Sequence, residues 1–273
     1  MLAHAYVPPP PLADFVALFW LYEGGPLPPT KERALPTGTT ELVINLRADR
    51  LVIYDQQDHA RPHLFPGALI CGPHAEYFVI DRADQEAILG VHFKPGGARH
   101  FFRHPAGDFR NAHVALETVW GGRVGELRER LLATPTRQGK FQLLEQALLA
   151  QATRPLARHP AVAFALREFR RRPDVPTIAA VTGQLGLSAR RFGQLFSDEI
   201  GLTPKLYCRV RRFQGLLHRI EQGRRVDWPG LALSCGYYDQ AHCIRDFRAF
   251  SGLNPTAYLA RRGDHPNHVP LGR

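Results

Sequence analysis

Apolar positions along the chain change their spacing near residue 97. Before it, short apolar runs between turn-forming segments predict strands at residues 41–46, 51–54, 68–71, 76–80 and 87–93. Residues 24–36 and 55–66 predict loops, whereas residues 12–22 fit either a helix or a strand. Several short strands at near-regular spacing are typical of a sandwich or small barrel. After residue 97, apolar residues recur at helical spacing, which predicts helices at residues 98–102, 116–120, 124–132, 140–152 and 161–171.

Between residues 175 and 258 one pattern occurs twice. Four pairs of residues lie 51 positions apart, namely Phe196 and Phe247, Gly201 and Gly252, Pro204 and Pro255, and Tyr207 and Tyr258. A fixed period of this kind indicates two copies of one supersecondary unit.

Each copy predicts a helix, a tight turn and a second helix. In the first copy, Ile178, Val181 and Leu185 fit one apolar helix face, and Gly186 gives the backbone freedom that a short turn needs. Ser188 in the first copy and Asp239 in the second are candidate N-caps. The second helices are expected at residues 188–200 and 239–250, with an apolar side made by Phe192, Leu195, Phe196, Cys243, Phe247 and Phe250.

The polar side of each second helix suits contact with DNA. In a helix-turn-helix the second helix enters the major groove, where Arg pairs with guanine and Gln with adenine, while other cations neutralise phosphate. The candidate DNA-binding residues are Arg190, Arg191, Gln194, Gln240, His242, Arg245 and Arg248 on these helices, and Lys205 and Arg209 after the first. One such unit is equally well explained by ordinary solvated helices, but two copies with the same Gly-x-x-Pro-x-x-Tyr ending are not.

The positive charge of the chain is concentrated in the half that carries the repeat. The 273 residues have a net charge of +10. Residues 160–273 hold 18 Lys and Arg against 9 Asp and Glu, whereas residues 1–159 hold 17 against 16. A near-neutral half joined to a basic half favours a sensor joined to a module that binds a polyanion.

The repeat-bearing segment resembles the DNA-binding domain of the AraC/XylS transcription regulators. The residues that carry the resemblance are Leu185-Gly186-Leu187-Ser188, Gly201-Leu202-Thr203-Pro204, Gly236-Tyr237, Asp239-Gln240 and Gly252-Leu253-Asn254-Pro255, with Tyr207 and Tyr258. The resemblance implies two helix-turn-helix units joined by one linker helix, here from Lys205 to about Gln222 and ended by Gly223, that enter successive major grooves on one face of DNA. Gly193 departs from the family pattern and removes a side chain that could contact a base.

The N-terminal half is similar to a domain found on many AraC-type regulators. The similarity spans about residues 6–152 and is carried by Leu35-Pro36, Glu41-Leu42-Val43-Ile44-Asn45-Leu46, Cys71-Gly72-Pro73 and Gly90-Val91-His92-Phe93-Lys94-Pro95-Gly96-Gly97. It implies a cupin-like sensory domain without identifying a ligand.

No constellation of residues for catalysis stands out. His59 with His63 and His100 with His104 are four apart, but no Glu follows at ligand-like spacing, so no metal site or cofactor is predicted. His92 either points into a pocket or serves the structure, and the structural role is favoured. Cys235 and Cys243 are expected to fill a core. An alkylation-repair enzyme would need a cysteine cluster in the first half, which holds Cys71 alone.

The sequence therefore predicts an α+β, two-domain transcription regulator that is not an enzyme. We expect a strand-rich sensory domain at residues 1–152, a linker at 153–159, a tandem helix-turn-helix domain at 160–263 and a loose tail at 264–273. The expected partner is double-stranded promoter or operator DNA. RNA polymerase, a small-molecule effector and a second copy of the chain are further candidates. No membrane span or signal peptide is expected, so the location is cytoplasmic and the role most resembles that of an activator. The alternative is a small-molecule sensor with weak DNA binding.

Overall fold

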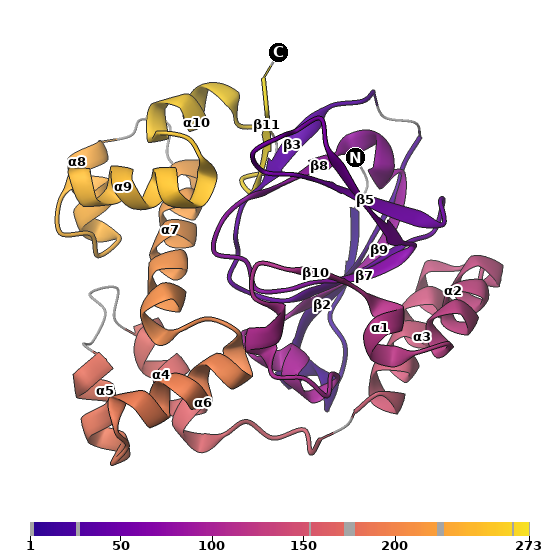
Figure 1. Ribbon diagram of the computed structural model, residues 1–273, viewed down its shortest axis with the longest axis horizontal. Helices are drawn as coiled ribbons and strands as arrows, with labels where there is room; N and C mark the ends of the chain where they lie inside the picture. The colour runs from indigo at the N-terminus through magenta and orange to yellow at the C-terminus, as the bar shows by residue number, and fades with distance from the viewer. Residues whose placement is uncertain are drawn as a thin grey trace.

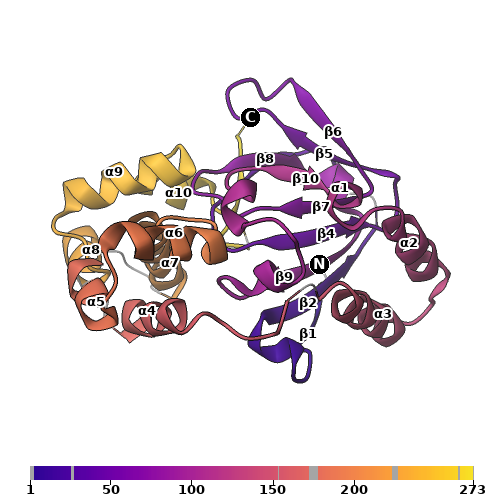
Figure 2. The same ribbon diagram turned by 60° about the horizontal axis from the view of Figure 1, so that its bottom comes forward.

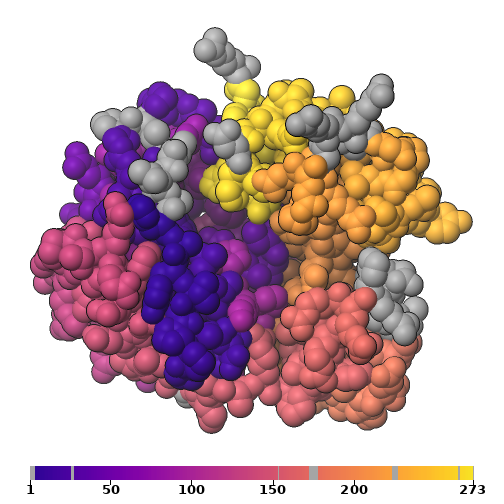
Figure 3. Space-filling view, turned by 180° about the vertical axis from the view of Figure 1, so that it is seen from behind, coloured from indigo at the N-terminus to yellow at the C-terminus, as the bar shows by residue number. Residues whose placement is uncertain are grey.

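A barrel of short strands and a helical domain lie side by side in the computed structural model (Figure 1). The structure describes residues 3–25, 28–152, 154–171, 178–222, 227–263 and 265–272. The space-filling view from behind shows the helical domain, coloured salmon to yellow, lying directly against the barrel (Figure 3). The predicted order, strand-rich domain first and helical domain second, is confirmed.

Two antiparallel sheets form the barrel. The first has the strand order β1-β2-β9-β4-β7-β10, with bounds Ala3–Tyr6, Val16–Glu23, Ala87–Phe93, Glu41–Asn45, Ala68–Cys71 and His113–Ala115. The second has the order β11-β3-β8-β5-β6, with bounds His268–Pro270, Lys31–Ala34, Phe78–Asp81, Arg50–Tyr54 and Pro62–Pro66.

Alternation along the central strands separates two hydrophobic clusters. On β4, Leu42 and Ile44 face outward into a core that includes residues of three helices, α1 (Leu116–Trp120), α2 (Arg123–Ala133) and α3 (Arg137–Ala150). Val43 faces the opposite way, into a cluster with Leu51, Leu69, Cys71 and Ile88 inside the barrel. Figure 2 shows α2 and α3 on the opposite side of the strands from the helical domain. Short 3-10 helices lie at Leu12–Asp14 (η1), Arg82–Gln85 (η2), Gly97–His100 (η3) and Ala106–Phe109 (η4).

The described residues of the second domain form seven helices around one core. They are α4 (Pro160–Arg171), α5 (Ile178–Leu185), α6 (Ala189–Ile200), α7 (Pro204–Gln222), α8 (Trp228–Ser234), α9 (Gln240–Ser251) and α10 (Pro255–Arg261). The core also contains Leu35 and Val269, which lie next to or on the strands β3 and β11. No helix in these described ranges combines the length and the apolar character of a membrane span.

The chain returns to the barrel after the last helix. His268, Val269 and Pro270 of β11 pair antiparallel with Ala34, Arg33 and Glu32 of β3, so the segment predicted as a loose tail contains an ordered strand. Val269 is completely buried, and Tyr258 Oη donates a hydrogen bond of 2.9 Å to the carbonyl of Pro266. The sequence does not show this strand because its partner lies more than 200 positions earlier.

Two further strands lie in segments predicted as loops, and these predictions were wrong. β6 pairs only with β5 and is mostly exposed, so backbone pairing rather than an apolar face defines it. β3 carries the charged residues Glu32 and Arg33, which become buried only because β8 and β11 flank the strand. Residues 12–22, for which helix and strand were both open, form η1 and most of β2. Gly223, which was predicted to end the linker helix, lies outside the described residues.

Candidate nucleic-acid interface

The first repeated unit is a helix-turn-helix with both ends of its second helix capped. Gly186, between α5 and α6, has a φ of +63°, which glycine adopts without steric cost. Ser188 Oγ accepts a hydrogen bond of 3.2 Å from the backbone N–H of Arg191 and so caps the N-terminus of α6. At the other end, Gly201 adopts a left-handed conformation with a φ of +89°.

The second unit repeats this geometry. Gly236, between α8 and α9, has a φ of +81°, and Asp239 Oδ1 accepts a hydrogen bond of 2.6 Å from the backbone N–H of His242. Gly252 ends α9 with a φ of +69°. Both predicted caps and both predicted turns are therefore confirmed, and the two second helices begin in the same way.

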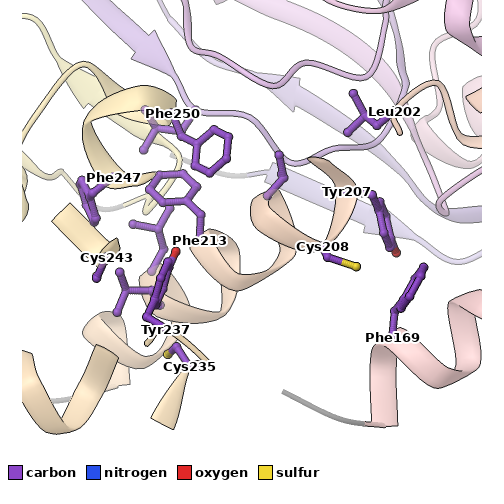
Figure 4. Packing of buried hydrophobic residues seen from close by; sticks show 14 of the residues in the cluster. Phe169, Leu202, Tyr207, Cys208, Phe213, Cys235, Tyr237, Cys243, Phe247 and Phe250 are labelled. Carbon is purple, nitrogen blue, oxygen red and sulfur yellow. The ribbon is translucent and has the colours of Figure 1, made fainter. Parts of the chain in front are cut away.

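Helix α7 joins the two units and sets their separation. Its 19 residues correspond to about 28 Å at 1.5 Å per residue, which is comparable to the roughly 34 Å between successive major grooves on one face of DNA. Figure 4 shows Tyr207 of the first turns of α7 near Phe169 of α4, and Phe213 in the middle of α7 pointing toward Phe247 and Phe250. The ring centroids of Phe213 lie 5.2 Å from Phe247 and 5.3 Å from Phe250.

Seven of the nine predicted DNA-binding side chains lie on the surface. They are Arg190, Arg191 and Gln194 of α6, Lys205 of α7, and Gln240, Arg245 and Arg248 of α9. Arg190, Arg191 and Gln240 lie in the first turn of their helices, the end that contacts bases in a helix-turn-helix. Gln194 Nε2 donates a hydrogen bond of 2.8 Å to Asp198 Oδ1, so it must leave this carboxylate to reach DNA.

Arg209 and His242 are instead held within the domain. Arg209 Nη2 lies 2.7 Å from Asp246 Oδ1, and its guanidinium lies over the ring of Phe250. Asp246 is only 3% exposed, so the ion pair ties α7 to α9 in a largely buried place. The half-buried ring of His242 packs edge-on against Tyr237 and has Nε2 4.0 Å from Asp246 Oδ2.

Comparison with known families agrees with this geometry. Residues 181–261 match a family described as a helix-turn-helix domain. The C-terminal part of the chain is a helix-turn-helix domain of the AraC type. The protein is accordingly a DNA-binding transcription regulator. Residues 4–115 match a domain of unknown function, DUF6597.

Two solved structures of ToxT from Vibrio cholerae are similar over most of their length. One covers 89% of this chain and 97% of its own, with 7% sequence identity and a TM-score of 0.47. The other, of wild-type ToxT with a bound unsaturated fatty acid, covers 88% and 94%, with 9% identity and a TM-score of 0.46. No curated protein matches the chain.

The C-terminal end of α6 in the AraC-type domain packs on the barrel. A Cβ at Gly201 would lie 2.2 Å from Pro73 Cγ and 2.9 Å from the carbonyl oxygen of Ala106, so only glycine allows this approach. Arg158 lies over the ring of Phe15 and bonds to the carbonyl of Pro95, which fixes the segment before α4 to the barrel. The exposed N-terminal turn of α6 and its docked C-terminal turn thus connect the outer surface of the helix-turn-helix to the barrel.

Helix α7 and the second unit also contact the barrel. Gln214 Nε2 of α7 donates hydrogen bonds to the carbonyl of Pro36 at 2.8 Å and to Asn267 Oδ1 at 2.9 Å. A Cβ at Gly252 would lie 2.6 Å from Cε1 of Tyr77, in the loop before β8. Both helix-turn-helix units therefore end against the barrel.

Replacement of Glu199, at the end of α6 that packs on the barrel, should stabilise the folded protein at neutral pH. Glu199 is 8% exposed, and its Oε2 accepts a hydrogen bond of 3.3 Å from the backbone N–H of His159. Burial raises the pKa of the Glu199 carboxyl. The hydrogen bond from His159 and the charges of Arg158 and Arg99 lower this pKa, but by less than burial raises it. A carboxyl with a raised pKa stabilises the fold below its unfolded pKa, and this contribution is lost as pH rises through the folded pKa.

We therefore expect Glu199→Gln to raise the free energy of unfolding at pH 7, by more than the ~0.5 kcal/mol typical of exposed substitutions. The gain should shrink toward pH 4, where the wild-type carboxyl is also neutral. Urea denaturation at both pH values measures it, with the exposed Glu129→Gln as control. Equal or lower stability of Glu199→Gln at pH 7 would contradict the argument.

The cysteines of the DNA-binding domain fill its core, as predicted. Cys208, Cys235 and Cys243 are free and buried. Burial raises the pKa of Cys208 and of Cys243 to about 12, so both thiols stay protonated at neutral pH. This state fits a packing role rather than a redox role.

The barrel contains several interacting His, Glu, Asp and Cys side chains for which the sequence predicted no site. His92 Nδ1 lies 3.0 Å from Glu41 Oε1, and its Nε2 lies 3.2 Å from Thr39 Oγ1. Burial lowers the pKa of His92, but the hydrogen bond and charge of Glu41 outweigh this effect and raise it. His63 pairs with Asp55, and His100 packs on Phe15. Cys71, His74 and His113 come together from separate segments.

Proposed function

We propose that the protein is a transcriptional activator that inserts α6 and α9 into two successive major grooves of one DNA site. The observation that supports this most directly is the similar start of both helices. Each begins at a side-chain cap after a left-handed glycine and presents cationic or amide side chains in its first two turns. The length of helix α7 is also comparable to the distance between successive major grooves on one face of DNA.

The exposed side chains have different roles in this proposal. Arg190, Arg245 and Gln240 contact base edges, because guanidinium and amide groups match the hydrogen-bonding patterns of guanine and adenine. Arg191, Lys205 and Arg248 are exposed cations beside them and neutralise phosphate. Arg209 acts instead as a positioning residue, since its pair with Asp246 joins the linker helix to α9.

The barrel acts as the regulatory part. It contacts the ends of both helix-turn-helix units through Pro73 and Tyr77, so a ligand that changes these contacts can change DNA affinity. Contact with RNA polymerase, pairing with a second copy of the chain and the activating role rest on the resemblance to AraC/XylS regulators. The proposed cytoplasmic location rests on the DNA-binding domain.

Capture of genomic DNA by the purified chain tests the proposal. Sequencing of the captured fragments should give one recurrent site with two half-sites about one helical turn apart. Titration of this site at several salt concentrations should show affinity falling steeply with salt and at least about 10³-fold tighter than for random DNA. Affinity equal to that for random DNA would overturn sequence-specific binding and favour a sensor whose DNA contact is weak.

A further inference from the structure

Three soft or borderline metal-ligating groups meet inside the barrel. Cys71 ends β7, His74 follows it in the loop before β8, and His113 begins β10. Cys71 and His113 are direct partners in the β7–β10 pairing, so their side chains point to the same face of the sheet. The ligand atoms of all three residues lie within 4.8 Å of one another.

The imidazoles of His74 and His113 each have a ring nitrogen that is free to bind a ligand. Nε2 of His74 and Nε2 of His113 are buried, and neither has a hydrogen-bond partner among the described residues. Such unpartnered polar atoms are costly unless another group satisfies them. The backbone at Ala112 hydrogen-bonds His74, an interaction that in metal sites fixes the ring of a ligating histidine.

The state of these rings suits coordination. Burial lowers the pKa of His74 to about 4 and that of His113 well below its usual value. Burial thus favours the neutral form of each ring, and a neutral imidazole donates a lone pair to a metal. Cys71 is 9% exposed, and its burial, followed by the charge of Glu41, raises the pKa of its thiol. Coordination by Cys71 consequently releases its proton to solvent.

A carboxylate lies next to the cluster. Glu41 on β4 is the direct partner of Cys71 in the β4–β7 pairing, and it also pairs with His92 on β9. Glu41 already accepts a hydrogen bond from His92, so it can serve either as a fourth ligand or as a partner of a bound water.

We propose that Cys71, His74 and His113 form a site for a divalent metal ion of borderline softness, best matched by Zn²⁺, and that metal binding regulates the helix-turn-helix units. Thiolate and imidazole ligands favour Zn²⁺ over Mg²⁺ or Ca²⁺, which prefer oxygen. Ligand atoms each 2.0 to 2.3 Å from one Zn²⁺ lie within roughly 4 Å of each other, so movements of about 1 Å complete the site.

The loop of residues 72–77 links this site to the DNA-binding domain. Two neighbouring residues of this loop have different contacts, because His74 belongs to the cluster while Pro73 abuts Gly201 at the end of α6. Tyr77 of the same loop abuts Gly252 at the end of α9. Asn111, close to His113 in sequence, braces the loop through hydrogen bonds of 2.8 Å to the N–H of Ala75 and to Glu76 Oε1. Metal binding that repositions His74 therefore moves contacts with both units.

Metal content of the untagged 273-residue chain tests the site. After incubation with Zn²⁺ and extensive dialysis, the wild-type protein should retain one Zn²⁺ per chain. Cys71→Ser and His113→Gln should each weaken the Kd by more than about 100-fold, since even loss of a group that only orients a ligand costs 10- to 100-fold. Cys208→Ala, which removes another buried thiol, and His63→Gln, which removes an exposed imidazole, should retain the metal.

Co²⁺ gives a second measurement that does not depend on affinity. Wild-type protein loaded with Co²⁺ should show a thiolate-to-cobalt charge-transfer band, and Cys71→Ser should lack it. Thermal unfolding of the metal-free variants identifies any that fail to fold, and His74→Gln then provides a third independent substitution. No retained metal in the wild type, or equal retention in all variants, overturns the site.

The regulatory part of the inference rests on the proposed function and is measured separately. Addition of Zn²⁺ should change the Kd for the captured DNA site by at least about 5-fold, within the usual range of coupling between sites. Cys71→Ser should show no such change. Metal binding without any change in DNA affinity overturns the regulation and leaves the site standing. Absence of specific DNA binding with and without Zn²⁺ overturns the proposed function instead.

Discussion

Replacing Arg190 and Arg245 together by alanine should weaken binding to the specific DNA site by at least about 30-fold. Each side chain lies exposed on one of the two second helices, and loss of an Arg that pairs with guanine costs about 1–3 kcal/mol. The two helices are separate units, so their losses should add to at least about 2 kcal/mol. Fluorescence titration of a labelled site at fixed salt concentration measures the change.

The single variants separate base recognition from general attraction to DNA. Arg190→Ala and Arg245→Ala should each lose discrimination at a different half-site, while binding to random DNA falls only slightly. Arg130→Ala removes an exposed charge from α2 on the barrel and should bind like the wild type. Wild-type affinity in the double variant would show that α6 and α9 do not contact bases through these residues.

Substitution of Phe213 by alanine should lower the free energy of unfolding of the DNA-binding domain by about 3–5 kcal/mol, the usual cost of removing a buried aromatic ring. Phe213 is completely buried and packs against Phe247 and Phe250 of α9. The cavity would open between the linker helix and the second unit. We therefore also expect the affinity for the two-part DNA site to fall, because the second unit loses its fixed orientation.

Urea denaturation measures the stability change, and Leu233→Ala is the matched control. Leu233 is also apolar but is 61% exposed on α8, so its loss should change the free energy by less than ~0.5 kcal/mol. Affinity for a DNA fragment that holds only the first half-site should be unchanged in Phe213→Ala, provided that it is measured well below the denaturation temperature. If Phe213→Ala lowered the free energy of unfolding by less than about 1 kcal/mol, the packing of Phe213 against α9 would not be part of the core of the domain.

The helix-turn-helix units could be predicted from sequence because their determinants are local. Ser188 and Asp239 cap helices that begin one residue later, and Gly186 and Gly236 allow turns within their own units. The apolar positions at helical spacing then determine which side is buried, as Phe192, Phe247 and Phe250 show. None of these features depends on a distant partner.

The parts that the sequence did not reveal depend on contacts between distant segments. Glu32 and Arg33 look like loop residues until β8 and β11 flank them. Arg209 looks like a free cation until α9 brings Asp246 to 2.7 Å. The Cys71 cluster has a local signal in the three-residue spacing of Cys71 and His74, but the third member, His113, is about 40 positions further along.

The pairing of β3 with β11 has a consequence for synthesis on the ribosome. Ala34 pairs with His268, a residue translated 234 positions later, which at 5–20 residues per second is a delay of roughly 10 to 50 s. Throughout that interval the edge of β3 that later pairs with β11 has no partner strand. Lys31, Glu32 and Arg33 place charge along that edge, and charged side chains discourage pairing between open strands of different chains. The charges on β3 thus oppose aggregation of the nascent chain until β11 has been translated and pairs with β3.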